Sequence, residues 1–200
     1  MKRIFTFLMI VAFATSAIAP AKAQLKGEWS MKGGAGYLSL PDLILGLAVG
    51  LGSIDDTEGV VREDFTPMVD PTLEFHYGVN NWLALGGSAT VGYLSAKTLL
   101  GNTGAVNKSV SCFYNTLCVN AISRYFTSPK FSMYGSWGVG AMLVSTQQRD
   151  RSNGSSSQFA GTLMANVYPL CFSVGGSIGG FCELGWGAKG FVNAGVYYNF

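Results

Sequence analysis

Apolar and polar residues alternate in steps of two along most of this chain, which is the pattern of β-strands with two unlike faces. Between residues 131 and 147, the odd positions include Trp137 and Val139, while even positions such as Ser136 and Gly138 are small or polar. Eight segments follow this alternation: 28–38, 68–77, 82–96, 112–126, 131–147, 159–174, 179–186 and 191–200. The pattern therefore predicts an all-β fold with eight strands.

Short turns and long polar connections alternate between these segments. The short turns fall at Gly78-Val79-Asn80-Asn81, Ser128-Pro129-Lys130 and Gly175-Gly176-Ser177, and the long polar stretches at 52–67, 98–110 and 149–157. Neighbouring strands joined in this way run antiparallel, and three turns with two chain ends account for four hairpins. We therefore expect an eight-stranded antiparallel up-and-down β-barrel.

The composition favours a barrel that crosses a membrane. Charged residues make up 12% of the chain and apolar residues 48%, whereas soluble domains carry about 25% charged residues. The longest apolar run beyond the N-terminal segment, 43–51, is far too short for a spanning helix. A soluble barrel such as a lipocalin would need a charged outer face, which the strands do not provide. Aromatic residues gather near the predicted strand ends, as in lipid-embedded barrels: Trp29, Tyr37, Tyr77, Trp82, Tyr93, Tyr125, Phe131, Trp186 and Phe200.

The N-terminal segment predicts export. Lys2 and Arg3 precede an apolar stretch, and Ala21-Lys22-Ala23 supplies small residues for signal peptidase, so 1–23 is expected to be a cleaved signal peptide. Residues 24–200 then form one barrel domain. Without the signal peptide the formal net charge changes from +2 to −1, so the chain has no basic face for nucleic acid.

The last strand predicts the cellular location of the protein. Val196, Tyr198 and Phe200 alternate up to the terminal Phe, a pattern similar to the C-terminal β-signal that the barrel-assembly machinery recognises in outer-membrane proteins. We expect outer-membrane lipid and lipopolysaccharide as surroundings, in a Gram-negative bacterium.

The chain resembles the small outer-membrane β-barrels common in Bacteroidetes, within the broad porin-like and Outer membrane protein A-like group. The residues that carry the resemblance are Gly27-Glu28-Trp29-Ser30, Val79-Asn80-Asn81-Trp82-Leu83, and the final GGFCELGWGAKGFVNAGVYYNF with Phe181, Glu183, Leu184, Gly185 and Gly187. The ending Tyr-Asn-Phe departs from relatives with Arg before the last Phe. The resemblance implies a barrel and an outer-membrane location, while most members have no assigned activity.

The few charged residues within strands predict an ion network in the lumen. On the parity of the strands, the following side chains face inward near the end with the short turns: Glu28, Lys32, Glu74, His76, Arg124 and Glu183. Side chains alone can fill an eight-stranded barrel, so we expect Lys32 and Arg124 to pair with Glu74 and Glu183 as a plug. The alternative is a narrow gated pore or a proton path.

Candidate chemistry elsewhere is sparse. His76 is the only histidine and lies close to a predicted periplasmic turn, so we predict no catalytic set, no metal site and no cofactor. Cys171 and Cys182 are equidistant from the middle of the turn at 176–177, so a disulfide between them is one alternative. The other alternative is that these two cysteines, with Cys112 and Cys118, are small apolar fillers.

The first long connection is the most distinctive. It joins an apolar piece at 40–51 to an acidic piece with Asp55, Asp56, Glu58, Glu63 and Asp64. Pro41 and Asp42 predict a short helix at the outer leaflet, and the acidic piece predicts a solvated loop without ordered calcium-ligand spacing. We therefore expect a non-enzymatic barrel that contributes to envelope integrity or binds through its loops. The alternative is a narrow channel or conduit for small or hydrophobic solutes.

Overall fold

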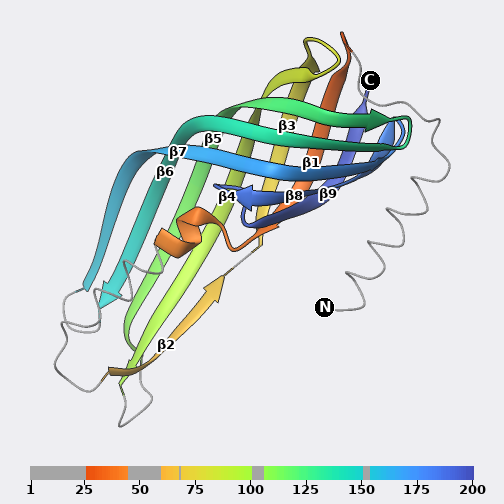
Figure 1. Ribbon diagram of the computed structural model, residues 1–200. Coiled ribbons are helices and arrows are strands. Elements are labelled where there is room, and N and C mark those ends of the chain that lie inside the picture. The colour runs from red at the N-terminus through yellow and green to blue at the C-terminus, as the bar shows by residue number, and fades with distance from the viewer. Residues whose placement is uncertain (1–25, 45–59, 68, 101–105, 151–153) are drawn as a thin grey trace.

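The strands form one antiparallel sheet in the computed structural model, which describes residues 26–44, 60–67, 69–100, 106–150 and 154–200 (Figure 1). Their bounds are β1 Trp29–Tyr37, β2 Val60–Pro67, β3 Asp70–Gly78, β4 Leu83–Leu100, β5 Val106–Ser128, β6 Phe131–Asp150, β7 Gly154–Gly175, β8 Ile178–Trp186 and β9 Val192–Asn199. The predicted signal peptide, 1–23, lies outside the described residues, as do Asp55, Asp56 and Glu58.

The sheet closes on itself as a barrel of eight strands. β2 and β3 both pair with β4: β3 pairs with residues 84–90 of β4, and β2 pairs with residues 94–100. Together β2 and β3 therefore occupy one position in the ring. The ring runs β1, β3, β4, β5, β6, β7, β8, β9 and returns to β1. The predicted eight-stranded antiparallel up-and-down β-barrel is therefore confirmed. The prediction of a loop over 52–67 is wrong from residue 60 onward, where β2 continues the wall.

The two ends of the barrel differ. At one end, which we call the turn end, three tight turns join β3 to β4, β5 to β6 and β7 to β8, and β9 terminates there. At the other end, the loop end, the wall has unequal height: β4 to β7 have 18 to 23 residues, whereas β1, β3, β8 and β9 have eight or nine. Figure 1 shows the long strands continuing beyond the short ones together with β2.

The alternation predicted from the sequence sorts side chains between the two faces of the wall. Large apolar residues point outward, as Leu117, Val139 and Leu163 do, and Leu163 is 88% exposed. Val196, Tyr198 and Phe200 of the predicted β-signal are also on this outer face. The buried inward side chains at the turn-end half are mostly polar. Among the described residues, no helix reaches the length and hydropathy needed to cross a membrane.

Candidate functional site in the lumen

The connection between β8 and β9 folds into the barrel instead of away from it. Gly187 and Gly190 adopt φ angles of 152° and 89°, which side-chain-bearing residues rarely adopt. Asn166 Oδ1 accepts the Ala188 N–H at 2.8 Å, and the Tyr168 hydroxyl accepts the Lys189 N–H at 3.0 Å while donating to the Gly190 carbonyl. These contacts hold residues 187–190, the inward loop, against β7.

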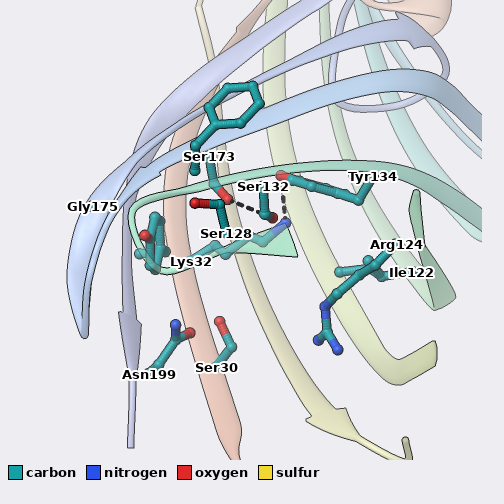
Figure 2. Close-up of a pocket in the computed structure, with 12 residues that line it drawn as sticks. Ser30, Lys32, Ile122, Arg124, Ser128, Ser132, Tyr134, Ser173, Gly175 and Asn199 are labelled. Carbon is teal, nitrogen blue, oxygen red and sulfur yellow. Dashed lines mark hydrogen bonds between the residues drawn. The ribbon is translucent and has the colours of Figure 1, made fainter. Parts of the chain in front are cut away.

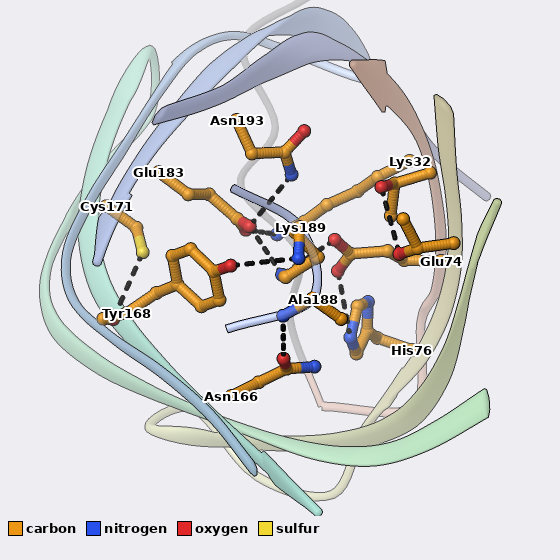
Figure 3. A network of polar contacts seen from close by, with 12 residues as sticks. Lys32, Glu74, His76, Asn166, Tyr168, Cys171, Glu183, Ala188, Lys189 and Asn193 are labelled. Carbon is orange, nitrogen blue, oxygen red and sulfur yellow. Dashed lines mark hydrogen bonds and ion pairs between the residues drawn. The ribbon is translucent and has the colours of Figure 1, made fainter. Parts of the chain in front are cut away.

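The inward loop places Lys189 at the centre of an ion network (Figure 3). Its ammonium group donates to Glu74 Oε1 at 2.8 Å and to Glu183 Oε2, and all three side chains are buried. Lys32 donates to the other Glu183 oxygen at 2.9 Å. The lumen thus holds two carboxylates and two ammonium groups in alternating contact, which is the arrangement that compensates charge in a low-dielectric interior.

Hydrogen bonds from neutral groups complete the network. The Tyr134 hydroxyl donates to Glu183 Oε1 at 3.0 Å and accepts from Lys32 at 2.8 Å, and Asn193 donates to Glu183 Oε2 at 3.2 Å. His76 is buried with Nε2 3.5 Å from Glu74 Oε2. Because side chains from β1, β3, β6, β8 and β9 all meet here, the network ties opposite walls of the barrel together.

The structure brings together four of the six residues expected in the lumen network: Lys32, Glu74, His76 and Glu183. Arg124 lies nearer the turn end, where its guanidinium reaches the carbonyl oxygens of Asn80 and Asn81 at 3.4 and 3.5 Å. Glu28 immediately precedes β1 at the same end. The second ammonium group that pairs with the two glutamates belongs to Lys189, a residue that the strand pattern of the sequence does not indicate.

A pocket opens below the network at the turn end. Its lining includes Ser30, Arg124, Ser132 and Asn199, with Lys32 and Tyr134 among its walls (Figure 2). Lys32 thus contributes both to this pocket and to the buried network above it.

Above the network, an apolar cluster lies inside the barrel. Tyr114, Met142, Val144 and Met164 cluster with Ala188 of the inward loop, and Leu40 packs against them. Met142 and Val144 occupy inward positions on β6, although the alternation in that strand predicts small or polar inward residues. The lumen therefore contains an apolar layer in addition to the ionic one.

The predicted short helix forms, but it is not at the outer leaflet. Residues 40–44 are helical, and Asp42 is completely buried beside the Tyr114 hydroxyl. Leu40 donates its backbone N–H to the Gly187 carbonyl at 3.0 Å, which links the helix to the inward loop. The expected outer-leaflet position is therefore wrong, because the apolar cluster inside the barrel provides a better-packed surface for Leu40.

The disulfide alternative for Cys171 and Cys182 is also wrong, since all four cysteines are free thiols. The β7–β8 pairing aligns Gly175 with Gly179, so three residues, 176–178, lie between the closing pair of the hairpin instead of the two expected. This shifts the register by one residue, so Cys171 pairs with Glu183 and faces the lumen, while Cys182 pairs with Phe172. The two thiols therefore point to opposite faces of the wall.

The arrangement can block and brace the barrel. Among the described residues, no three His, Cys, Asp or Glu side chains are grouped as a metal site would require. The donors and acceptors of Lys189, Glu183 and Lys32 are directed at one another. Fold and lumen together define a closed eight-stranded barrel with an apolar outside and a filled inside.

Comparisons with known proteins add fold-level likenesses. No family model matches the chain, and no curated protein matches its sequence. Similar solved structures include the N-terminal β-barrel domain of Pseudomonas aeruginosa OprF, with 11% identity over 88% of this chain and 100% of that chain at a TM-score of 0.46. The attachment invasion locus protein Ail of Yersinia pestis shares 14% identity over 88% of this chain and 100% of its own, also at 0.46. The outer membrane protein OprG of Pseudomonas aeruginosa shares 13% identity over 89% of this chain and 98% of its own, at 0.39.

Proposed function

We propose that this chain is an outer-membrane barrel of a Gram-negative bacterium that neither conducts solutes nor catalyses a reaction. Its apolar outer face supports contact with lipid. Short turns on one side and longer strands and loops on the other support a periplasmic turn end and an external loop end. In this proposal the barrel braces the envelope and presents its loop end to partners.

The buried network around Lys189 is the observation that carries the absence of conduction. An ion moving through the lumen would have to separate Lys189 from Glu74 and Glu183, which leaves buried charges without compensation. It would also have to displace the apolar layer around Met142 and Met164. Two unlike barriers in series make spontaneous opening rare.

Planar bilayer recording tests this proposal. The refolded full chain should insert without producing stable conductance steps, while a general porin added afterwards to the same bilayer should produce them. Stable single-channel steps from the chain alone would contradict the proposal and favour the narrow-channel alternative.

A binding role is supported by the part of the wall that stands above the short strands. Membrane-spanning strands need about 9–11 residues, so β5, with 23 residues, and its neighbours extend well beyond a bilayer. On one side of this extension, β7 pairs with β6 along its length, but β8 pairs only with Val167–Gly175. Among the described strands, the edge of β7 from Gly154 to Asn166 therefore has no partner on its β8 side.

The two edges of this extension differ in a way that supports strand binding at β7. The β2 edge contains Arg62, Glu63, Asp64 and Pro67 and a register shift near Val60, which are features that protect edges from pairing. The β7 edge from 154 to 166 has no charged residue and no proline, and residues 156–163 are all exposed. An extended, uncharged segment of a partner protein could add to this edge through backbone hydrogen bonds.

Selection from a library of linear peptides tests the binding role. Peptides captured by the full chain should have strand-forming, mostly uncharged sequences, and they should bind the double variant Ser156→Lys/Gln158→Lys at least about fivefold more weakly, because edge lysines oppose pairing. The control variant Gln147→Lys/Gln148→Lys adds the same charge on β6, one strand inside the edge. Equal binding to both double variants would exclude the β7 edge.

A further inference from the structure

Two buried aspartates meet at one tyrosine hydroxyl near the loop end. The Tyr114 oxygen lies 2.7 Å from Asp70 Oδ2, 3.1 Å from Asp42 Oδ1 and 2.7 Å from Ser39 Oγ. All four side chains are completely buried. Asp70 belongs to the barrel wall, whereas Ser39 and Asp42 belong to the segment that enters the barrel after β1, residues 38–44, which we call the cap segment.

The cap segment is ordered by these same groups. The Ser39 N–H donates to Asp42 Oδ2 at 3.1 Å, and the Asp42 N–H donates to Ser39 Oγ at 3.3 Å. This reciprocal pair is the capping arrangement that starts a helix. One Asp42 oxygen therefore serves the cap segment itself, and the other contacts Tyr114.

A count of hydrogens shows that the cluster needs one more proton than its hydroxyls supply. Three oxygen–oxygen contacts converge on Tyr114, and each hydrogen bond needs one hydrogen. The hydroxyls of Tyr114 and Ser39 supply two. The third has to come from a carboxyl group, since otherwise a carboxylate oxygen would face the lone pairs of Tyr114.

No compensating cation lies in this cluster among the described residues. The titratable groups that meet there are Asp42 of the cap segment, Asp70 of β3 and Tyr114 of β5, while Lys189 of the adjoining inward loop is directed at Glu74 and Glu183. Asp70 Oδ1 is buried without a hydrogen-bond partner. Burial next to a second carboxyl group, with no cation nearby, favours the protonated form of Asp70. The Tyr114 hydroxyl occupies the place between them, which favours a proton over a metal ion.

We propose that Asp70 holds one proton in the closed form and that this proton latches the cap segment over the apolar layer of the lumen. Loss of the proton to water leaves two carboxylates around one donor, so the cap segment separates from Asp70 and uncovers Met142 and Met164. The closed form binds a proton that the open form releases. A rise in pH therefore favours the open form, and a fall in pH favours the closed form. This inference does not depend on which partner the loop end binds.

Amide hydrogen exchange of the refolded full chain tests the latch. Three backbone N–H groups report directly on the cap segment: Leu40 bonded to Gly187, Leu43 bonded to Ser39, and Asp42. Protection factors divide out the intrinsic pH dependence of exchange. For the wild type they should fall between about pH 5.5 and about pH 8.5, with a limiting slope of about tenfold per pH unit for one released proton.

The matched variant is Asp42→Asn, which keeps the shape of the side chain and supplies the third hydrogen permanently from its amide. Its protection factors should stay high and independent of pH, and those of Asp70→Asn should do the same. Protection in the wild type that does not change with pH would overturn the latch. Restoration of wild-type protection at high pH by calcium, without an effect on Asp42→Asn, would also overturn it, in favour of a cation site.

Discussion

Replacing Lys189 with methionine should lower the free energy of unfolding of the barrel by about 3–5 kcal/mol, the cost of removing one partner from a buried ion network. Methionine fills a similar volume, but it leaves Glu74 without its ammonium partner. Glu183 keeps Lys32 as its one remaining ammonium partner among the described residues. Equilibrium unfolding in urea, followed by the gel shift between folded and unfolded barrels, measures the change.

Two further variants show whether charge is the cause. Lys26→Met removes an exposed lysine at the turn end and should change the free energy of unfolding by no more than about 0.5 kcal/mol. Adding Glu74→Gln to Lys189→Met should recover part of the loss, because the remaining carboxylate, Glu183, still pairs with Lys32. If Lys189→Met unfolds like the wild type, the network does not brace the barrel.

Gly36→Ala should be as damaging, although it adds a single methyl group. A Cβ at this position would lie 1.7 Å from the Lys189 carbonyl oxygen and 2.6 Å from its carbonyl carbon. These are backbone atoms of the inward loop, so a side-chain rotation cannot relieve the clash. We expect a loss of about 3 kcal/mol, the upper part of the range for overpacking, because the loop and its lysine have to move out of the lumen.

Gly33→Ala, three residues earlier in β1, is the matched control. Nothing lies within 4 Å of the Cβ that this substitution adds, so the free energy of unfolding should stay within about 0.5 kcal/mol of the wild type. Urea unfolding of both variants gives the comparison. Equal stability of Gly36→Ala and Gly33→Ala would mean that the inward loop does not approach β1 as closely as described.

The alternation of the sequence predicted the ring of strands because a closed wall needs only two unlike faces and short turns. The same pattern placed Lys32, Glu74 and Glu183 correctly on the inward face. It could not find Lys189, because a loop residue has no strand parity and its position depends on Gly36, Asn166 and Tyr168 of other strands. The pattern also missed the apolar inner layer at Met142. An inward methionine breaks the alternation, but the strand alone does not show which residues from other parts of the chain pack against it.

Strand β2 and the cap segment were misplaced for a related reason. A mixed, charged segment such as 60–67 forms a strand here because β4 is long enough to pair with it, and that length is not visible within the segment itself. The helix at 40–44 was predicted from Pro41 and Asp42, but its side of the wall was decided by the partners Tyr114 and Asp70.

The three-residue turn between β7 and β8 determines more than the state of the cysteines. In an antiparallel hairpin, the pair of residues that closes the turn fixes the register, and a slip of that register by one residue exchanges the two faces of the following strand. A hairpin closed by Gly175 and Ile178 would place Cys182 opposite Cys171, inside the barrel, and would carry Glu183 to the outer face, whereas the pairing with β9 requires Glu183 to lie opposite the buried Asn193. The closure of this turn therefore decides which chemistry enters the lumen, and the ion network around Glu183 in turn opposes a slip of the hairpin.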